Sequence, residues 1–152
     1  MSPATGGAEI PAPASPVLVP APVGIVLVSH SAAVATAVAE LARGLAGGGD
    51  LAPVLPAGGT PDGGLGTSAE LICEAAKAVD RGAGVALLVD LGSAVLTVKA
   101  LLAEGDELPE GCRLVDAPFV EGAVAALVTA SAGGDLDAVV AAASEAYGYR
   151  KE

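Results

Sequence analysis

The stretch VGIVLVSHSAAVATAVAELA, residues 23–42, changes from a strand-like to a helix-like pattern within a few residues. Residues 23–28 form a short apolar run rich in β-branched side chains, which is typical of a strand buried on both faces. Ser31 is a residue type that caps helices, and the alanine-rich pattern after it predicts a helix to about Leu45, before the glycines at 47–49. The sequence therefore predicts a buried strand that leads directly into a helix, with His30, the only histidine of the chain, at the junction.

The alternation of strands and helices continues along the chain. Further strands are predicted at residues 51–56, 84–90 and 112–118, the first at a sheet edge because its prolines cannot donate ladder hydrogen bonds. Further helices are predicted from Thr67 or Ser68 to about 80, from a Ser93 cap to about 104, and at 120–131 and 135–147. This order predicts an α/β fold, a mainly parallel four-stranded sheet with helices on both faces.

The chain of 152 residues is long enough for one domain. Residues 1–22 combine many prolines with alanine, glycine and serine, which predicts a flexible tail without a helix or central strand. Residues 23–150 are predicted to form the domain, with a core of small aliphatic side chains, since there is one Phe and no Trp.

Charge and hydropathy exclude several classes of function. The formal net charge of −11 disfavours binding to nucleic acid or to an anionic membrane surface. No apolar run is long enough to span a membrane, and residues 1–22 lack the charged start of a signal peptide, so we expect a cytoplasmic protein. Cys73 and Cys112 are far apart, and a single histidine supplies no ligand set, so no metal site is predicted.

Polar residues follow three of the predicted strands. They are the Ser29-His30-Ser31 segment, the glycine-rich loop AGGTPDGGLGTS at 57–68, and the Asp90-Leu91-Gly92-Ser93 segment. Ligands of parallel sheets collect at the carboxyl ends of the strands, so these segments are expected to meet there. The loop lacks the GK[ST] ending of a P-loop and the GxGxxG motif of a dinucleotide-binding fold, which disfavours a nucleotide site. The chain also lacks a GxSxG elbow, which disfavours a serine hydrolase.

A histidine between a strand end and a helix start could accept a phosphoryl group. The N–H groups of the helix start favour an anion, and oxygens of the group could contact Ser29, Ser31 and the amides of the glycine loop. One ring nitrogen must be unprotonated to attack phosphorus, and a carboxylate on the other nitrogen fixes that tautomer. Asp90 is the candidate carboxylate, and Ser93 is expected to cap its helix, to bind phosphate, or both.

Four segments resemble the phosphoryl donor subunits of phosphoenolpyruvate-dependent dihydroxyacetone kinases, the DhaM family. They are GIVLVSHSAAVATAVAELA, GGTPDGGLGTS, LLVDLGSAVLTVKALL and APFVEGAVAALVTAS, in this order, and the resemblance covers about residues 23–147. The family is related to the mannose-type IIA domains of the sugar phosphotransferase system, which have a three-layer α/β fold. The motifs DLGSA and FVEG favour the dihydroxyacetone branch.

The resemblance implies a phosphotransferase subunit. His30 would accept phosphate that comes from phosphoenolpyruvate through enzyme I and HPr, and would pass it to ADP on the nucleotide-binding subunit of the kinase. Asp90 would orient His30, Ser29, Ser31, Gly92 and Ser93 would contact phosphate, and Gly58, Gly59, Thr60 and Thr67 would border the site. It also implies a homodimer with no permanently bound cofactor.

Three other interpretations remain open at this point. The chain could be a mannose-type IIA domain that feeds a sugar permease, or a non-catalytic regulatory module that is phosphorylated on His30 as a signal. It could also be a small α/β binding domain with an incidental histidine.

Overall fold

A computed structural model describes residues 20–152, so most of the predicted tail at 1–22 lies outside the described residues. Its sheet contains four strands, β1 (Gly24–Ser29), β2 (Val54–Gly58), β3 (Val85–Val89) and β4 (Cys112–Val115). Each adjacent pair is parallel, and the order across the sheet is β2-β1-β3-β4. The predicted parallel α/β sheet is confirmed.

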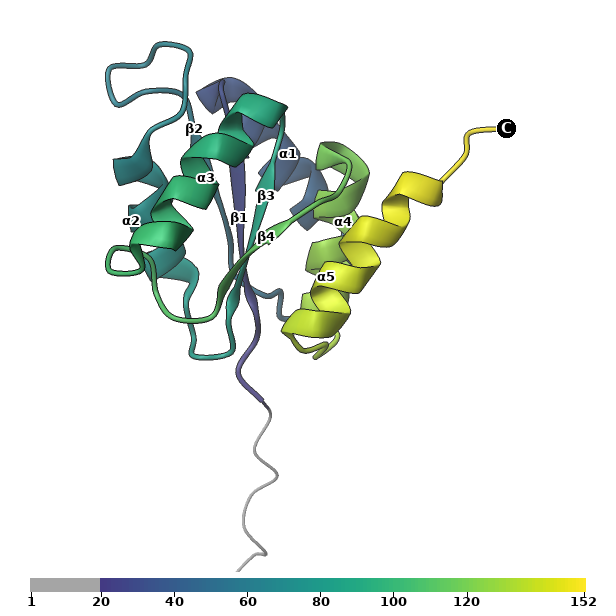
Figure 1. Cartoon of the computed structure of the whole chain (residues 1–152). Coiled ribbons are helices and arrows are strands. Elements are labelled where there is room, and N and C mark those ends of the chain that lie inside the picture. The colour runs from purple at the N-terminus through teal and green to yellow at the C-terminus, as the bar shows by residue number, and fades with distance from the viewer. Residues whose placement is uncertain (1–19) are drawn as a thin grey trace, which may run out of the picture.

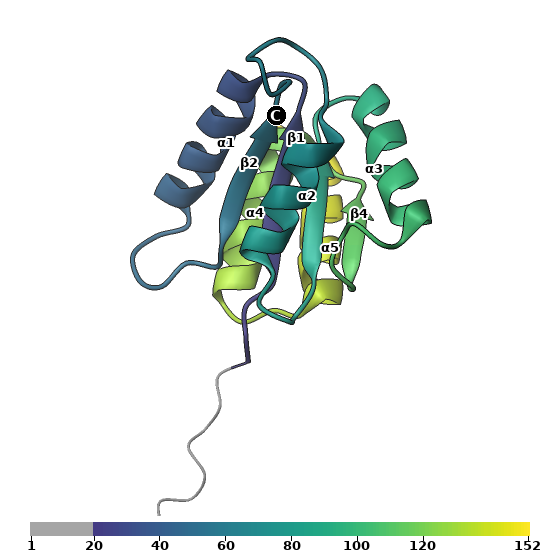
Figure 2. The same ribbon diagram turned by 90° about the vertical axis from the view of Figure 1, so that its left-hand side faces the viewer.

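Helices cover both faces of this sheet (Figures 1 and 2). One face carries α2 (Ala69–Val79) and α3 (Gly92–Glu104), and the other carries α1 (Ala32–Leu45), α4 (Phe119–Ser131) and α5 (Leu136–Glu145), followed by a short 3-10 turn at Ala146–Gly148. None of the helices described is both long enough and apolar enough to cross a membrane.

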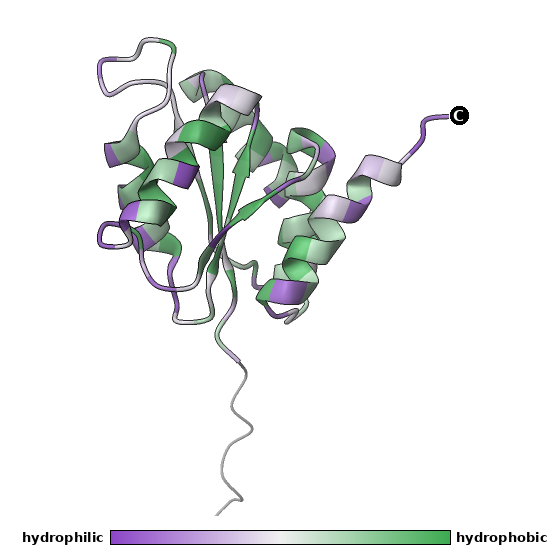
Figure 3. Cartoon of the chain, viewed as in Figure 1, coloured by the Kyte–Doolittle hydropathy of each residue, from purple (hydrophilic) through white to green (hydrophobic). Residues whose placement is uncertain are grey.

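Strand β1 is the centre of the core, and all six of its residues are buried. Successive side chains of a strand point to opposite faces. Ile25 and Leu27 therefore pack with the cluster under α1 and α4, whereas Val26 and Val28 pack with the cluster under α2 and α3. In the hydropathy view (Figure 3) the apolar strands lie between two layers of helices. Both faces of β1 are therefore buried, which explains why residues 23–28 do not alternate between apolar and polar side chains.

Strand β2 lies at the edge, as its prolines predicted, but it begins and ends later than residues 51–56. The N–H of Ile25 donates to the Pro53 carbonyl, and the N–H of Gly59 donates to the Ser29 carbonyl. This alternation directs residues 53, 55, 57 and 59 toward β1, so the nitrogen of Pro56 faces the open edge, where no donor is needed.

Serine side chains begin two of the helices. Ser31 caps α1 by accepting the N–H of Val34, and Ser68 caps α2 by accepting the N–H of Leu71. The prediction that Ser93 caps a helix is wrong, because α3 begins two residues earlier than a Ser93 cap requires, with Leu91 at the cap position and no side-chain cap. Ser93 lies inside the first turn of α3, which frees its hydroxyl for another contact.

Candidate functional site

The predicted site segments meet at one edge of the sheet. The chain leaves β1 to form β2 on one side and then returns to form β3 on the other side, so the strand order reverses at β1. His30 follows β1 directly, and Asp90 follows β3, the neighbour of β1. This reversal point is where ligands of open parallel sheets bind.

The His30 imidazole lies between a carboxylate and a hydroxyl. Its Nδ1 is 3.0 Å from Oδ1 of Asp90, and its Nε2 is 2.6 Å from Oγ of Ser93. With the proton on Nδ1, that nitrogen donates to the carboxylate, and Nε2 presents a lone pair. The His30 side chain is 26% exposed, and its Nδ1 is engaged by the carboxylate, so Nε2 is the ring nitrogen left for a reactant.

Asp90 is held by several donors besides the ring. Its Oδ2 accepts the Ser29 hydroxyl at 2.8 Å and the His30 N–H at 3.0 Å, and its Oδ1 accepts the Leu91 N–H at 2.7 Å. Burial raises the pKa of this carboxyl, but the His30 N–H, the Ser29 hydroxyl and the His30 ring together lower the pKa below its usual 3.8. Asp90 is thus a fixed carboxylate at neutral pH.

The lowered pKa predicts how the stability contribution of Asp90 depends on pH. Because the folded-state pKa lies below the unfolded value near 3.8, the contribution is present above that value and is lost as the pH falls through the folded pKa. We expect the difference in the free energy of unfolding between the native chain and Asp90→Asn to shrink as the pH falls from about 6 to about 2.5. Urea unfolding at several pH values measures this difference, and a constant difference would contradict the prediction.

Ser93 brings the start of α3 to the free ring nitrogen. Gly92 is the first residue of α3, and Ser93 is the second. The N–H groups of a helix start and the positive end of its dipole favour an anion. A phosphoryl group on Nε2 of His30 would therefore sit beside the N-terminus of α3 and the Ser93 hydroxyl.

Ser29 and Ser31 have other contacts in the structure. Ser29 is fully buried, and its hydroxyl donates to Asp90 and accepts the Ser31 N–H at 3.1 Å. The predicted phosphate contact of Ser29 is therefore not supported, because its oxygen is enclosed and committed to the carboxylate. The Ser31 hydroxyl accepts the Val34 N–H as the α1 cap, so this side chain is already engaged at the start of α1.

The glycine loop supports the backbone around His30. Gly59 donates its N–H to the Ser29 carbonyl, and Gly66 donates to the His30 carbonyl at 2.9 Å. Thr60 exchanges backbone hydrogen bonds with Gly63 and Gly64 inside the loop. These amides are occupied, so the prediction that they hold phosphate oxygens is not supported.

Two close contacts fix the loop against its neighbours. A Cβ on Gly58 would collide with the Ser31 carbonyl and come within 2.8 Å of the Ala32 Cα, so only glycine fits where β2 passes the start of α1. Thr67 Oγ1 lies 2.9 Å from Thr97 Oγ1 of α3. Thr97 and Gly66 were not identified from the sequence, and the spacing of Thr97 four residues after Ser93 was the available signal for the first of them.

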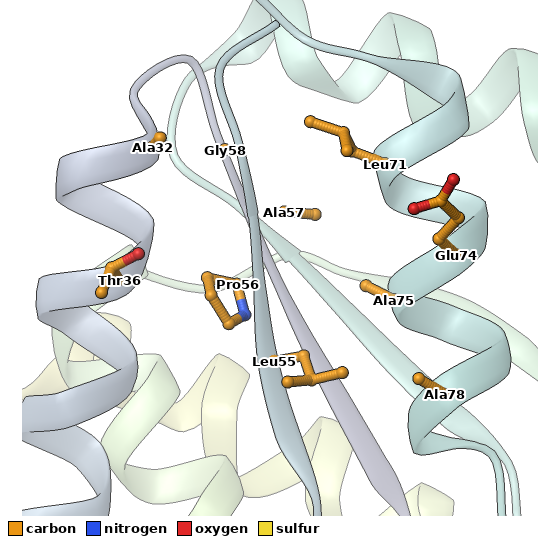
Figure 4. Close-up of a pocket in the computed structure, with 10 residues that line it drawn as sticks. All are labelled: Ala32, Thr36, Leu55, Pro56, Ala57, Gly58, Leu71, Glu74, Ala75 and Ala78. Atoms are coloured by element: carbon orange, nitrogen blue, oxygen red, sulfur yellow. The ribbon is translucent and has the colours of Figure 1, made fainter. Parts of the chain in front are cut away.

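Two clefts flank the sheet near this edge. A groove of about 410 Å³ runs along the open side of β2 between α1 and α2, and Figure 4 shows Pro56 at its centre, with Thr36 and Glu74 on the two helices. A second cleft of about 390 Å³ includes Asp90 and Gly92 with Asp116 and Tyr147, whose hydroxyl donates to Asp116. His30 lines neither cleft, and its side chain is partly exposed.

Comparisons with known proteins show which family the chain resembles. The model of the EIIA-man family, described as PTS system fructose IIA component, matches residues 24–140. The phosphoryl donor subunit DhaM of a phosphoenolpyruvate-dependent dihydroxyacetone kinase from Pantoea ananatis is 39% identical over 82% of this chain, and the one from Escherichia coli is 36% identical over 86%. The crystal structure of EF1359, described as a protein of unknown function, is 32% identical with a TM-score of 0.73 and covers 86% of this chain and 98% of its own.

The relatives differ in length. This chain spans 27% and 28% of the Pantoea and Escherichia proteins. It spans 84% of a DhaM subunit from Listeria innocua, with which it is 36% identical over 107 residues. The similarity therefore extends over nearly the whole of one relative and over a minor part of the other two.

Proposed function

The chain belongs to the EIIA-man family and is of the DhaM type, and from this premise we propose that it carries a phosphoryl group on Nε2 of His30 within a phosphoenolpyruvate-dependent dihydroxyacetone kinase. The donor is the phosphocarrier HPr, charged from phosphoenolpyruvate by enzyme I. The acceptor is ADP on the nucleotide-binding subunit of the kinase. The relay takes place in the cytoplasm, and the resemblance further suggests a homodimer.

One observation carries the proposal, namely that His30 has its two ring nitrogens in different environments. Nδ1 faces the Asp90 carboxylate, and Nε2 faces Ser93 at the start of α3. The carboxylate holds the proton on Nδ1, so the lone pair of Nε2 can attack phosphorus. The Ser93 hydroxyl and the helix start then lie where the charge of the transferring group is located.

The transfer needs no permanently bound cofactor. In the first step the Nε2 lone pair forms a bond to phosphorus while the bond from phosphorus to the donor side chain breaks, and the donor keeps that electron pair. The ring now carries a positive charge, which the Asp90 carboxylate stabilises through the Nδ1 proton. In the second step a β-phosphate oxygen of ADP attacks phosphorus, the Nε2–phosphorus bond breaks, and neutral imidazole leaves with its Nδ1 proton.

Partial exposure of the ring also fits a relay. A loose phosphoryl-transfer transition state requires an in-line nucleophile and fixed donors to the equatorial oxygens. Because the His30 side chain is partly exposed, a donor protein and an acceptor protein can each reach the ring in turn. A buried ring would require the fold to open at each transfer.

Ser93→Ala is expected to slow phosphorylation of His30 by about tenfold. The variant removes the hydroxyl beside Nε2 and leaves α3 intact, since Ser93 is not its cap. Ser93→Thr, which keeps a hydroxyl, is expected to restore most of the rate. Quenched-flow mass spectrometry with phosphorylated HPr measures both rates, and equal rates for the native chain and Ser93→Ala would contradict this role.

The relay is tested with the intact chain in two steps. Incubation with phosphoenolpyruvate, enzyme I and HPr is expected to add one acid-labile, alkali-stable phosphoryl group, detected by intact mass. Addition of ADP and the nucleotide-binding kinase subunit is then expected to remove that group and to form ATP. A phosphoryl group that stays on the chain would favour a signalling module, and its transfer only to a sugar permease would favour the mannose-type function.

A further inference from the structure

The hydroxyls of Thr67 and Thr97 form a contact to which the proposed relay gives no part. Their Oγ1 atoms are 2.9 Å apart, and the contact is partly buried. Thr67 precedes the Ser68 cap of α2, and Thr97 lies inside α3. Threonine is not a favourable residue in a helix interior, and its hydroxyl often bonds to the carbonyl one turn earlier. A hydroxyl that instead reaches another element indicates a tertiary role.

Each threonine is joined through its own element to a residue that touches His30. Gly66, directly before Thr67, donates its N–H to the His30 carbonyl at 2.9 Å. Ser93 lies four residues before Thr97, on the same side of α3, and its Oγ is 2.6 Å from Nε2 of His30. The hydroxyl contact therefore closes a circuit that leaves the backbone of His30 through the glycine loop and returns to its ring through α3.

The start of α3 has few other directional attachments. Figures 1 and 2 show it at the same end of the molecule as the glycine loop. Its cap position is Leu91, which provides no side-chain cap. In the described part of the chain, Ser93 and Thr97 are the only side chains of α3 that form hydrogen bonds. The buried side chains of the helix are apolar, and apolar burial is non-directional, so it holds the helix on the sheet without fixing its exact position.

We propose that the Thr67–Thr97 contact positions Ser93 for phosphoryl transfer, so that both threonines are positioning residues of the reaction on His30. This inference rests on the proposed function. The contact ties α3 to the loop that already holds the His30 backbone, and it thereby keeps the Ser93 hydroxyl beside Nε2 before phosphorus arrives. A donor group that is in place before the reaction costs no reorganisation in the transition state.

The length of the contact explains why two hydroxyls are required. Two hydroxyl oxygens share a proton at 2.9 Å, whereas two carbon atoms come no closer than about 3.5–4.0 Å. The double variant Thr67→Val/Thr97→Val would therefore hold α3 about 1 Å farther from the loop. A displacement of that size is enough to lengthen the 2.6 Å contact between Ser93 and Nε2 beyond hydrogen-bond distance.

A double-mutant cycle tests whether Thr97 acts through Ser93. Thr97→Val is expected to lower kcat for phosphorylation of His30 about fivefold with little change in KM, and Thr97→Ser, which keeps the hydroxyl, is expected to restore most of the rate. The combination Ser93→Ala/Thr97→Val is expected to be slowed about tenfold, as Ser93→Ala is alone, because the hydroxyl that Thr97 positions is then absent. Independent effects would multiply to about fiftyfold.

Two phosphoryl donors separate positioning from docking. Phosphorylated HPr must dock, whereas phosphoramidate is small enough to react without a protein surface. With phosphoramidate, the bond from phosphorus to its nitrogen breaks, a bond to Nε2 forms, and ammonia leaves with the electron pair. Because Ser93 lies beside the transferring group, the loss in Thr97→Val is expected with both donors. The matched control is Thr129→Val, a half-buried threonine of α4 on the other face of the sheet, which is expected to react at the native rate.

Stability measurements distinguish positioning from support of the fold. Thr67→Val and Thr97→Val each leave one partly buried hydroxyl without its partner, whereas the double variant removes both hydroxyls. Urea unfolding is therefore expected to show a lower midpoint for each single variant and a recovered midpoint for the double variant. The phosphorylation rate of the double variant is expected to stay about fivefold low, because apolar side chains do not restore the short contact.

Four results would overturn the positioning role. They are a native rate in Thr97→Val, losses that multiply in the cycle, a loss with HPr alone, and a rate that recovers together with stability in the double variant. Failure of the proposed function gives a different result, since the native chain would then accept no phosphoryl group from HPr, while phosphoramidate would still report on the threonines. A native chain that reacts with neither donor would overturn both proposals.

Discussion

His30→Ala is expected to abolish phosphorylation of this chain by the relay. The chain has one histidine, so no second imidazole can accept the group. Asp90 and Ser93 remain in the variant, but neither has the neutral nitrogen lone pair that Nε2 supplies. Intact mass after incubation with phosphoenolpyruvate, enzyme I and HPr is expected to show a gain of one phosphoryl group for the native chain and none for the variant.

The variant must be shown to be folded for that loss to be informative. The His30 ring is only partly buried, and Asp90 keeps the Ser29 hydroxyl and two backbone N–H donors when the ring is removed. We therefore expect a loss of about 1 kcal/mol in the free energy of unfolding, which leaves the chain folded. An undiminished mass gain in a folded His30→Ala chain would place the acceptor elsewhere and contradict the assignment.

Most of the fold follows from short-range patterns in the sequence. Apolar runs identified the four strands, and serine caps identified the starts of α1 and α2. The alternation of strands and helices predicted a parallel sheet, which in turn predicted that residues after β1 and β3 would be neighbours. The proximity of His30 and Asp90, separated by 60 residues in sequence, is a consequence of that topology.

The assignment of individual hydroxyls could not be predicted in the same way. Ser29, Ser31 and Ser93 all occur beside predicted strand ends, and each can cap a helix, bind an anion or hold a carboxylate. Their contacts depend on where β1 ends and on where α3 begins, differences of one or two residues that propensity does not resolve. The structure directs Ser29 to Asp90, Ser31 to the α1 cap and Ser93 to His30.

The hydrogen-bond partners of the glycine loop could not be predicted from its composition either. Its composition suggested free amides that could hold an anion, but backbone donors in a compact loop are usually satisfied by nearby carbonyls. The Gly66 N–H is used by the His30 carbonyl, and the Thr60 N–H is used by Gly64. Thr97 was missed because its contact with Thr67 joins two elements whose packing the sequence does not specify.

Asp90→Asn is expected to lower the rate of His30 phosphorylation by about 10²- to 10⁴-fold while the chain remains folded. The side-chain amide that this substitution introduces can donate to Nδ1, which favours the tautomer with the proton on Nε2 and leaves no lone pair there to attack phosphorus. An uncharged amide also fails to stabilise the positive ring that forms in the transfer. Quenched-flow mass spectrometry with phosphorylated HPr measures the rate.

Asp116→Asn is the matched control, because Asp116 follows the neighbouring strand β4 and its carboxylate accepts the Tyr147 hydroxyl and has no contact with His30. It is expected to react at the native rate.

If both variants were slowed equally, the effect would come from the loss of negative charge at this edge of the sheet, which would slow the encounter with a basic donor. A loss confined to Asp90→Asn, and present with phosphoramidate as well as with HPr, would locate it in the tautomer and charge of the ring, because phosphoramidate needs no docking. A native rate in Asp90→Asn would contradict the prediction, because it would show that the carboxylate is not needed to keep the proton on Nδ1 and the lone pair on Nε2.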